Sequence, residues 1–280
     1  MSDATTRDAP ASDIWTGPFR EPRNMAAEVK GSIHDDATAT KLGFRGGTVA
    51  GSVHLDQFVP RLVDLYGERW FETGGLSLYF TQATVDREEV QAVVVGGEPR
   101  ARLSMYNRAG AQICLGTASG GPDAQAELAG RMAAQAAADP SGLRILAALR
   151  VGDEGETRVR IDAARLAAHR EIITEDLPAY ADGVLPPSQA IGLAHQARAA
   201  AVGKAAQPHV GLFGALEVQH LDGPLRADVD YRARTRILKL TESPKTENTW
   251  HQIVFADGDR DVARVLMYLR FLKGSSPLWS

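Results

Sequence analysis

One segment near the N-terminus holds most of the residues that could do chemistry. It contains His34, Asp35 and Asp36, and a glycine-rich turn over residues 43–51 follows them. The turn leads into a predicted helix that begins just after Gly51. The first N–H groups of a helix are unpaired and carry partial positive charge, so they can hold a carbonyl oxygen or a developing oxyanion. The spacing therefore predicts a general acid/base, His34, facing a carbonyl bound at the N–H of Gly51.

His54 and Asp56 lie in the first turn of the same predicted helix. Asp56 is either a catalytic carboxylate or one that the helix dipole favours for structural reasons. His54 is either a site residue or a hydrogen-bonded core residue. Asp35 and Asp36 could assist His34, although such residues more often cap turns and helices. Four neighbouring residues are predicted to contact a bound substrate: Arg45, Gly47, Ser52 and Phe58.

This segment matches neither a nucleotide-binding motif nor a metal-binding motif. The turn over residues 43–51 lacks the Gly-Lys-Ser/Thr of a P-loop and the GxGxxG fingerprint. Adjacent residues of an extended chain point to opposite sides, and no HxH or HxxxH pair accompanies His34. No resident cofactor and no metal ion are therefore expected.

The composition is that of a globular protein with a small-molecule partner. The chain has 280 residues, of which 44% are hydrophobic and 24% charged. Its net charge of −4 lacks the basic excess of proteins that bind nucleic acid or anionic membranes. The single cysteine, Cys114, excludes an intramolecular disulfide. Neither a signal peptide nor a stretch of about 20 apolar residues is present, so a cytoplasmic location is expected.

An internal repeat indicates how these residues are positioned. A predicted helix over residues 52–66 is followed by predicted strands, and a helix over residues 188–202 is followed by a matching set. Ser52 and Leu76 are as far apart as Ser188 and Leu212, and a shift of 136 positions superposes the copies. The predicted strands cover residues 76–85, 90–95, 101–106 and 112–117 in the first copy, and 212–221, 227–238, 249–256 and 262–272 in the second.

A long helix buries its apolar face best when it lies across a curved antiparallel sheet, which is the hot-dog arrangement. The predicted fold is therefore α+β, a double hot-dog with two such units in tandem, imitating a homodimer within one chain. Two of these chains could pair further as a homodimer. The predicted boundaries are a disordered tail over residues 1–12, an N-terminal unit with the site over 13–120, a linker with a helical middle over 121–142 and a C-terminal unit over 143–280.

The second unit holds less chemistry than the first. Pro187 occupies the position that matches Gly51, and a proline there removes the N–H that would hold an oxyanion. This unit is expected to complete the pocket, with His195 or His220 as contributors. Three arginines share one face of a predicted strand, where they would either meet the phosphates of a carrier or face solvent: Arg232, Arg234 and Arg236.

The segment around His34 resembles the MaoC-like, (R)-specific enoyl-CoA hydratase branch of the hot-dog superfamily. Ile33-His34 matches the Ile-His of that signature, Asp36 the following Asp, residues 43–46 the Gly-Phe-x-Gly, and Gly51 the oxyanion glycine. The chain also departs from the signature. Val29 stands where the family has its catalytic Asp, Ala50 replaces the His before the glycine, and the segment from His34 to residue 43 is one residue shorter.

The resemblance implies a hydratase or dehydratase, a lyase, that acts on an acyl thioester or a related activated carbonyl compound. CoA or an acyl-carrier protein would carry the acyl group. Gly51 would polarise the carbonyl, and His34 would move the proton with help from Asp36, Asp35 or His54. Two alternatives stay open: a hot-dog thioesterase with Asp56 as base or nucleophile, and a non-catalytic acyl-binding or partner protein.

Overall fold

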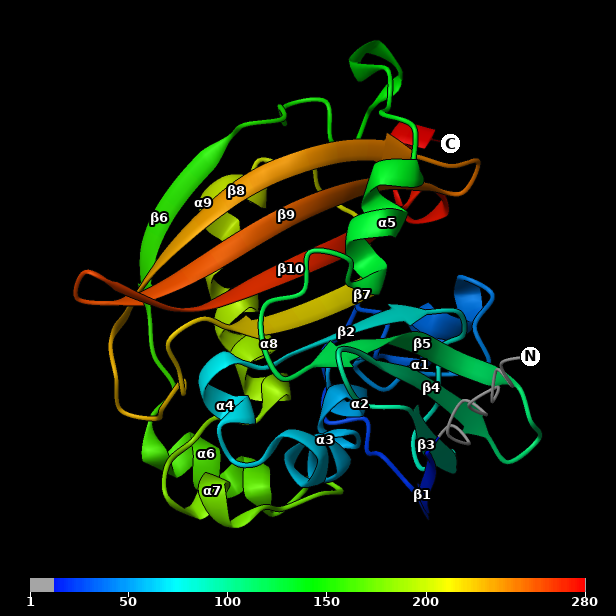
Figure 1. Ribbon diagram of the computed structural model, residues 1–280. Helices are drawn as coiled ribbons and strands as arrows, with labels where there is room; N and C mark the ends of the chain where they lie inside the picture. The colour runs from blue at the N-terminus through cyan, green and yellow to red at the C-terminus, as the bar shows by residue number, and fades with distance from the viewer. Residues whose placement is uncertain (1–12, 280) are drawn as a thin grey trace, which may run out of the picture.

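The computed structural model describes residues 13–279, so the tail predicted over residues 1–12 lies outside the described residues. Ten strands form one antiparallel sheet in the order β1-β3-β4-β5-β2-β7-β10-β9-β8-β6 (Figure 1). The strands of the first half are β1 (Ile14–Arg20), β2 (Gly75–Phe80), β3 (Val90–Val95), β4 (Ala101–Asn107) and β5 (Gln112–Ser119). Those of the second half are β6 (Glu154–Val159), β7 (Gly211–His220), β8 (Tyr231–Glu242), β9 (Thr246–Asp257) and β10 (Arg260–Leu272).

The sheet consists of two halves with the same strand order. Outward from the centre, the first half runs β2-β5-β4-β3-β1 and the second runs β7-β10-β9-β8-β6. The halves join edge to edge where β2 pairs with β7, from Gly75 opposite Gln219 to Tyr79 opposite Ala215. The two central strands begin at Gly75 and Gly211, 136 positions apart. The predicted architecture of two tandem copies is thereby confirmed.

The two long predicted helices are each divided in the structure. The first becomes α2 (Val53–Asp56) and α3 (Val59–Tyr66), with Pro60 in the first turn of α3. Proline suits a first turn but interrupts a helix interior, so it starts a new helix here. The second becomes α8 (Pro187–Ala197) and α9 (Ala199–Val202).

Several elements had no counterpart in the sequence prediction. Strands β1 and β6, each at an outer edge of the sheet, were missed because short edge strands carry little periodic signal. The other helical elements without a predicted counterpart are α1 (Asp36–Lys41), α4 (Trp70–Thr73), α6 (Ala163–Arg170), α7 (Pro178–Ala181), and the short 3₁₀ turns Pro140–Gly142, Lys273–Ser275 and Pro277–Trp279. Helix α5 (Glu127–Ala134) lies in the middle of the predicted linker.

The helices of both units bury most of the core against one face of the sheet. One cluster of buried side chains joins α2, α3 and α8 to strands of both halves. The opposite face carries a smaller cluster in which Leu128 of α5 packs with Trp250 and Tyr268. In Figure 1, α5 crosses in front of the sheet whereas α8 and α9 lie behind it. The helical middle predicted for residues 121–142 thus packs on the sheet as α5.

Asp56 connects the two units through the end of a helix. Its side chain is 1% exposed, and Oδ1 accepts a hydrogen bond of 2.9 Å from the backbone N–H of Ser188, in the first turn of α8. His169 Nε2 bonds the Ser188 hydroxyl at 2.8 Å and lies 3.7 Å from Asp56 Oδ2. Because α8 has no capping side chain of its own, Asp56 supplies the cap from the other unit.

We expect the substitution D56A to destabilise the fold. It leaves the N–H of Ser188 buried without a partner, which costs about 1–3 kcal/mol in the free energy of unfolding. Urea denaturation followed by circular dichroism measures that cost. The matched control is D64A, which removes an exposed carboxylate from α3 and should change stability by less than about 0.5 kcal/mol. Equal stability of D56A and D64A would contradict the capping role.

Candidate functional site

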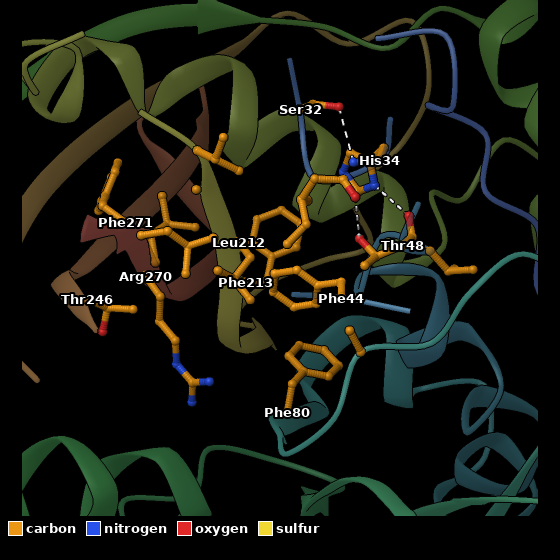
Figure 2. Close-up of a pocket in the computed structure, with 18 of the residues that line it drawn as sticks. Ser32, His34, Phe44, Thr48, Phe80, Leu212, Phe213, Thr246, Arg270 and Phe271 are labelled. Carbon is orange, nitrogen blue, oxygen red and sulfur yellow. Dashed lines mark hydrogen bonds between the residues drawn. The ribbon is translucent and has the colours of Figure 1, made fainter. Parts of the chain in front are cut away.

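A cavity of about 980 Å³ opens between the two units, where β2 ends and β7 begins. One wall comes from the loop before α1 and the glycine-rich turn that follows α1. The other comes from the end of α8 and from β7 and β10 (Figure 2). The lining includes residues 29–34, 48–49, 79–84, 207, 209–213, 243, 245–246 and 268–272. Its position between the units means that neither unit could form it alone.

His34 lines this cavity from the loop before α1. Its Nδ1 lies 2.7 Å from the backbone carbonyl oxygen of Thr48, as Figure 2 shows. A carbonyl only accepts, so Nδ1 carries the proton and Nε2 is left with its lone pair. The Asn24 side-chain amide donates to the His34 carbonyl at 2.8 Å and holds the loop in place. The arrangement leaves Nε2 of the ring without a protein partner in the described range and able to accept a proton.

Gly51 lines the same cavity, and its N–H makes no hydrogen bond to any residue in the described range. A Cβ at this position would lie 2.8 Å from the Phe80 ring, so any residue other than glycine would require that ring to move. The helix that follows, α2, has four residues. Its dipole therefore adds little, and the donor is the N–H group itself. His34 and Gly51 thus lie on one cavity, as the sequence predicts.

Asp35 and Asp36 do not line the cavity but build the loop around His34. Asp36 Oδ1 accepts the N–H of Gly47 at 3.1 Å, and a Cβ on Gly47 would lie 2.3 Å from the His34 carbonyl oxygen. Asp35 accepts from the Thr38 hydroxyl at 2.7 Å. That hydroxyl, together with the Lys30 ammonium, lowers the pKa of Asp35. The positions of Asp35 and Asp36 do not support direct assistance to His34, because hydrogen bonds of the scaffold hold both carboxylates.

His54 is 2% exposed and lines the cavity. Its Nε2 lies 2.9 Å from the Thr84 hydroxyl, whereas its Nδ1 has no partner within residues 13–279. Burial lowers the pKa of His54 to about 4, although the Glu88 charge opposes the shift. At neutral pH this imidazole is uncharged, and its free nitrogen is available to a ligand.

The other predicted contacts of the first unit lie outside the cavity lining. Asp56 caps α8, and Phe58 is fully buried in the core. Arg45 is bound to Glu88 at 2.6 Å, and Ser52 stands at the N-cap of α2. Gly47 passes beneath His34. The place of each of these side chains depends on packing between segments that are distant in the sequence. The local sequence pattern does not report that packing.

The second unit contributes His195, as predicted, together with Arg198, which the sequence analysis missed. Desolvation, with the charge of Arg198, lowers the pKa of His195 to about 4, even though the ring still reaches solvent through the cavity. His220 instead packs against Trp70 outside the cavity, with ring centroids 5.5 Å apart. The three strand arginines also lie outside it: Arg232, Arg234 and Arg236.

The cavity walls combine apolar surface with positive charge. In the view of Figure 2, the rings of Phe44, Phe80 and Phe213 lie between His34 and Arg270. Four lysine and arginine side chains line the cavity, and no aspartate or glutamate of the described residues does. Val29, at the position of the family's catalytic Asp, presents an apolar side chain to the cavity. The cationic residues are Lys30, Arg198, Lys245 and Arg270.

Neither a metal centre nor a membrane span emerges from the described part of the chain. Within residues 13–279, no group of three or more His, Cys, Asp or Glu side chains is arranged to hold a metal ion. No helix in that range is both long and apolar enough to cross a bilayer.

No protein-family model and no curated protein sequence matches this chain. Solved structures do. A putative MaoC domain protein dehydratase from Chloroflexus aurantiacus matches with a TM-score of 0.64 and 11% identity over 96% of this chain and 99% of that one. The dehydratase domain of PpsC from Mycobacterium tuberculosis, in complex with C12:1-CoA, matches with a TM-score of 0.54 and 13% identity over 94% of each chain.

A putative oleoyl thioesterase from Lactobacillus plantarum also matches, with a TM-score of 0.51 and 11% identity over 94% of this chain and 98% of that one. The predicted double hot-dog fold is confirmed by the sheet order and by the likeness to a Mycobacterium tuberculosis protein described as having a double hot-dog fold, with a TM-score of 0.56 and 12% identity over 94% of this chain and 96% of that one. Because dehydratases and a thioesterase share the fold, the residues in the cavity must distinguish the activities.

Buried neutral histidines predict a stability that falls in acid. Burial lowers the pKa of His54 and His220 to about 4 and that of His251 to about 3. The unfolded chain therefore binds more protons than the folded one below about pH 6.5, and stability is lost as the pH falls from there towards 4. From pH 8 to pH 5, the free energy of unfolding should fall by roughly 2 kcal/mol per histidine.

The variant H220L tests whether His220 is buried in its neutral form, because leucine has a similar volume and no titrating group. Urea denaturation at pH 8 and pH 5 should show a pH-dependent loss smaller by roughly 2 kcal/mol than in the unaltered protein. An unchanged pH dependence in H220L would show that His220 is not the neutral group described here.

Proposed function

We propose that this chain is a MaoC-like hydro-lyase that adds water to, or eliminates it from, an acyl thioester. The observation that carries the proposal is the shared cavity of His34 and Gly51. One residue offers a base of defined tautomer and the other an unpaired N–H donor. A base and a donor facing one carbonyl compound are what proton abstraction next to that carbonyl requires.

The cavity walls support an acyl thioester as the substrate. Phe44, Phe80 and Phe213 provide apolar surface for an acyl chain. Lys245 and Arg270, on strand ends and turns at the cavity, provide positive charge for the phosphates of CoA or of a carrier protein's prosthetic arm. The proposed addition or elimination of water uses only side chains and a backbone N–H of this chain, so the reaction as proposed involves no metal ion and no resident cofactor.

The proposed elimination uses a single base. With the carbonyl held by the N–H of Gly51, His34 Nε2 takes the proton from the carbon next to the carbonyl. The bond from the next carbon to its hydroxyl oxygen then breaks. The imidazolium returns its proton to that oxygen, so water leaves and neutral His34 is restored. Because no carboxylate of the described residues lines the cavity, one imidazole performs both proton transfers. Hydration is the reverse sequence.

His54, which lines the same cavity, could support the same step. If the Thr84 hydroxyl donates to His54 Nε2, the proton of the neutral ring resides on Nδ1, the nitrogen without a protein partner. That N–H would be a second donor to the thioester oxygen. The depressed pKa keeps the ring neutral, so it stabilises negative charge as a donor and not as a cation.

The thioesterase alternative required Asp56 at the site. Asp56 is 1% exposed, lies outside the cavity lining and holds the N–H of Ser188. It therefore has no path to a thioester in the cavity. The third possibility, a protein that binds acyl groups without turnover, differs from the proposal in its kinetics alone, and the following experiment separates the two.

We expect H34Q to lower kcat for hydration of 2-enoyl-CoA substrates by about 100-fold or more, because glutamine keeps the polar contact with Thr48 but cannot cycle a proton. Loss of the enoyl absorbance measures the rate. D36N is the matched control: an asparagine oxygen still accepts from Gly47, and Asp36 lies outside the cavity, so kcat should change by no more than a few-fold.

Three results would contradict the proposal. Release of free thiol without hydration would indicate a thioesterase. Binding of enoyl-CoA without turnover by the unaltered protein would indicate an acyl-binding protein. A large loss of kcat in D36N with little loss in H34Q would exchange the roles assigned to the two residues.

A further inference from the structure

Arg198, at the C-terminal end of α8, is a cation in the cavity without an acidic partner. Its Nη2 lies 3.3 Å from His195 Nε2, and its Nε is buried without a hydrogen-bond partner among the described residues. No salt bridge to Arg198 is found within residues 13–279. An unpaired cation in a partly desolvated position is costly, and proteins usually pair such a group.

The neighbours of Arg198 do not supply the missing negative charge. His195 and His251 lie within electrostatic reach, and burial lowers the pKa of these rings to about 4 and about 3. They are therefore neutral above pH 5. His251 is fully buried and its Nε2 also lacks a partner in the described chain. The carbonyl ends of α8 favour a cation here but leave the Arg198 Nε unsatisfied.

The other cations of the cavity are in different situations. Lys30 is bound to Asp35 at 3.2 Å. The Arg270 guanidinium lies over the rings of Tyr79 and Tyr268, and Lys245 is exposed on a turn. Arg198 is thus the cation of the cavity lining whose side chain is partly buried, has no acid beside it in the described range, and has an Nε without a hydrogen-bond partner there.

Arg198 also shares the cavity of the proposed reacting centre. Its Nη2 lies 3.3 Å from His195 Nε2, and His34, His195 and Arg198 line the same cavity. An anion bound at Arg198 would therefore lie in the cavity that holds the base. The phosphates of a CoA-type carrier are separated from the thioester by the long pantetheine arm, so they do not fit this position.

We propose that Arg198 binds a carboxylate at the end of the acyl chain, and that the substrate is a short acyl thioester with a free acid group. The planar guanidinium can offer two parallel N–H donors to a carboxylate, which a lysine cannot. The proposal rests on the proposed function, because it names the acyl group that the same site takes. Arg198 would determine specificity and would not take part in the proton transfers.

Binding measurements test this inference independently of turnover. Isothermal titration compares succinyl-CoA, butyryl-CoA and free CoA, of which the first two have acyl chains of equal length and differ in the carboxylate. The unaltered protein should bind succinyl-CoA more tightly than butyryl-CoA. In R198M the dissociation constant for succinyl-CoA should rise about 10- to 100-fold, with butyryl-CoA and free CoA changed by less than about 3-fold.

Two further variants complete the design. R198K keeps the charge without the planar fork and should recover only part of the affinity for succinyl-CoA. R236M removes an exposed arginine of β8 outside the cavity and should leave all three affinities unchanged. Thermal unfolding verifies that R198M is folded, and its Tm should equal or exceed that of the unaltered protein, because a cation without a partner is removed.

The outcomes separate the two proposals. Equal loss of affinity for all three ligands in R198M would assign Arg198 to the carrier and overturn the acyl carboxylate. Equal binding of succinyl-CoA and butyryl-CoA by the unaltered protein would also overturn it, while leaving the proposed function standing. Failure of both thioesters to bind would remove the proposed function itself.

Discussion

The pairing of β2 with β7 is the constraint from which the rest of the structure follows. It joins two antiparallel sheets into one ten-stranded sheet, so the helices of the two units must share one face. Helices α2 and α8 then lie in contact, and the Asp56 carboxylate reaches the N–H of Ser188. The cavity forms where this central strand pair ends, with walls from the two units. Without the pairing, neither the core nor the site would be complete.

The two units share a fold but have diverged in chemistry. At the start of the first long helical segment, Gly51 leaves an N–H free beside the cavity. At the matching position of the second unit, Pro187 has no N–H, and the next residue, Ser188, is held by Asp56 and His169. In the proposed function the first unit supplies the base and the donor, whereas the second supplies α8 and a wall of the cavity. Duplication thus provides the geometry of a dimer while allowing each half a different role.

The carboxylates near the site serve the scaffold. Asp36 holds the turn beneath His34, Asp35 is bound by Thr38 and Lys30, and Asp56 caps α8. The cavity itself is lined by imidazoles and cations, and no carboxylate of the described residues lines it. This separation of charge accounts for the two proposals made for the site. In the proposed elimination, an imidazole without a carboxylate partner must carry out both proton transfers. The positive charge of the lining favours a ligand that carries negative charge.

The sequence by itself determined the elements with strong local signals. Alternating strands from 90–95 to 262–272 appear within a few residues of their predicted ends, and the repeat of 136 positions is the spacing of β2 and β7. The segment from His34 to Gly51 was also recognisable, because base, turn and donor lie within one stretch of chain. Such features depend on residue order and on neighbours a few positions away.

Only the tertiary structure decided which of these residues face the cavity. Asp56 and His54 lie two positions apart in the same short helix, yet one caps α8 and the other lines the site. Arg198 reaches the cavity from a helix far along the chain, and no local pattern distinguishes it from an ordinary surface arginine. The burial and the hydrogen-bond partners of these residues depend on contacts between the two units. The spacing of residues within a short stretch of sequence does not report such long-range contacts.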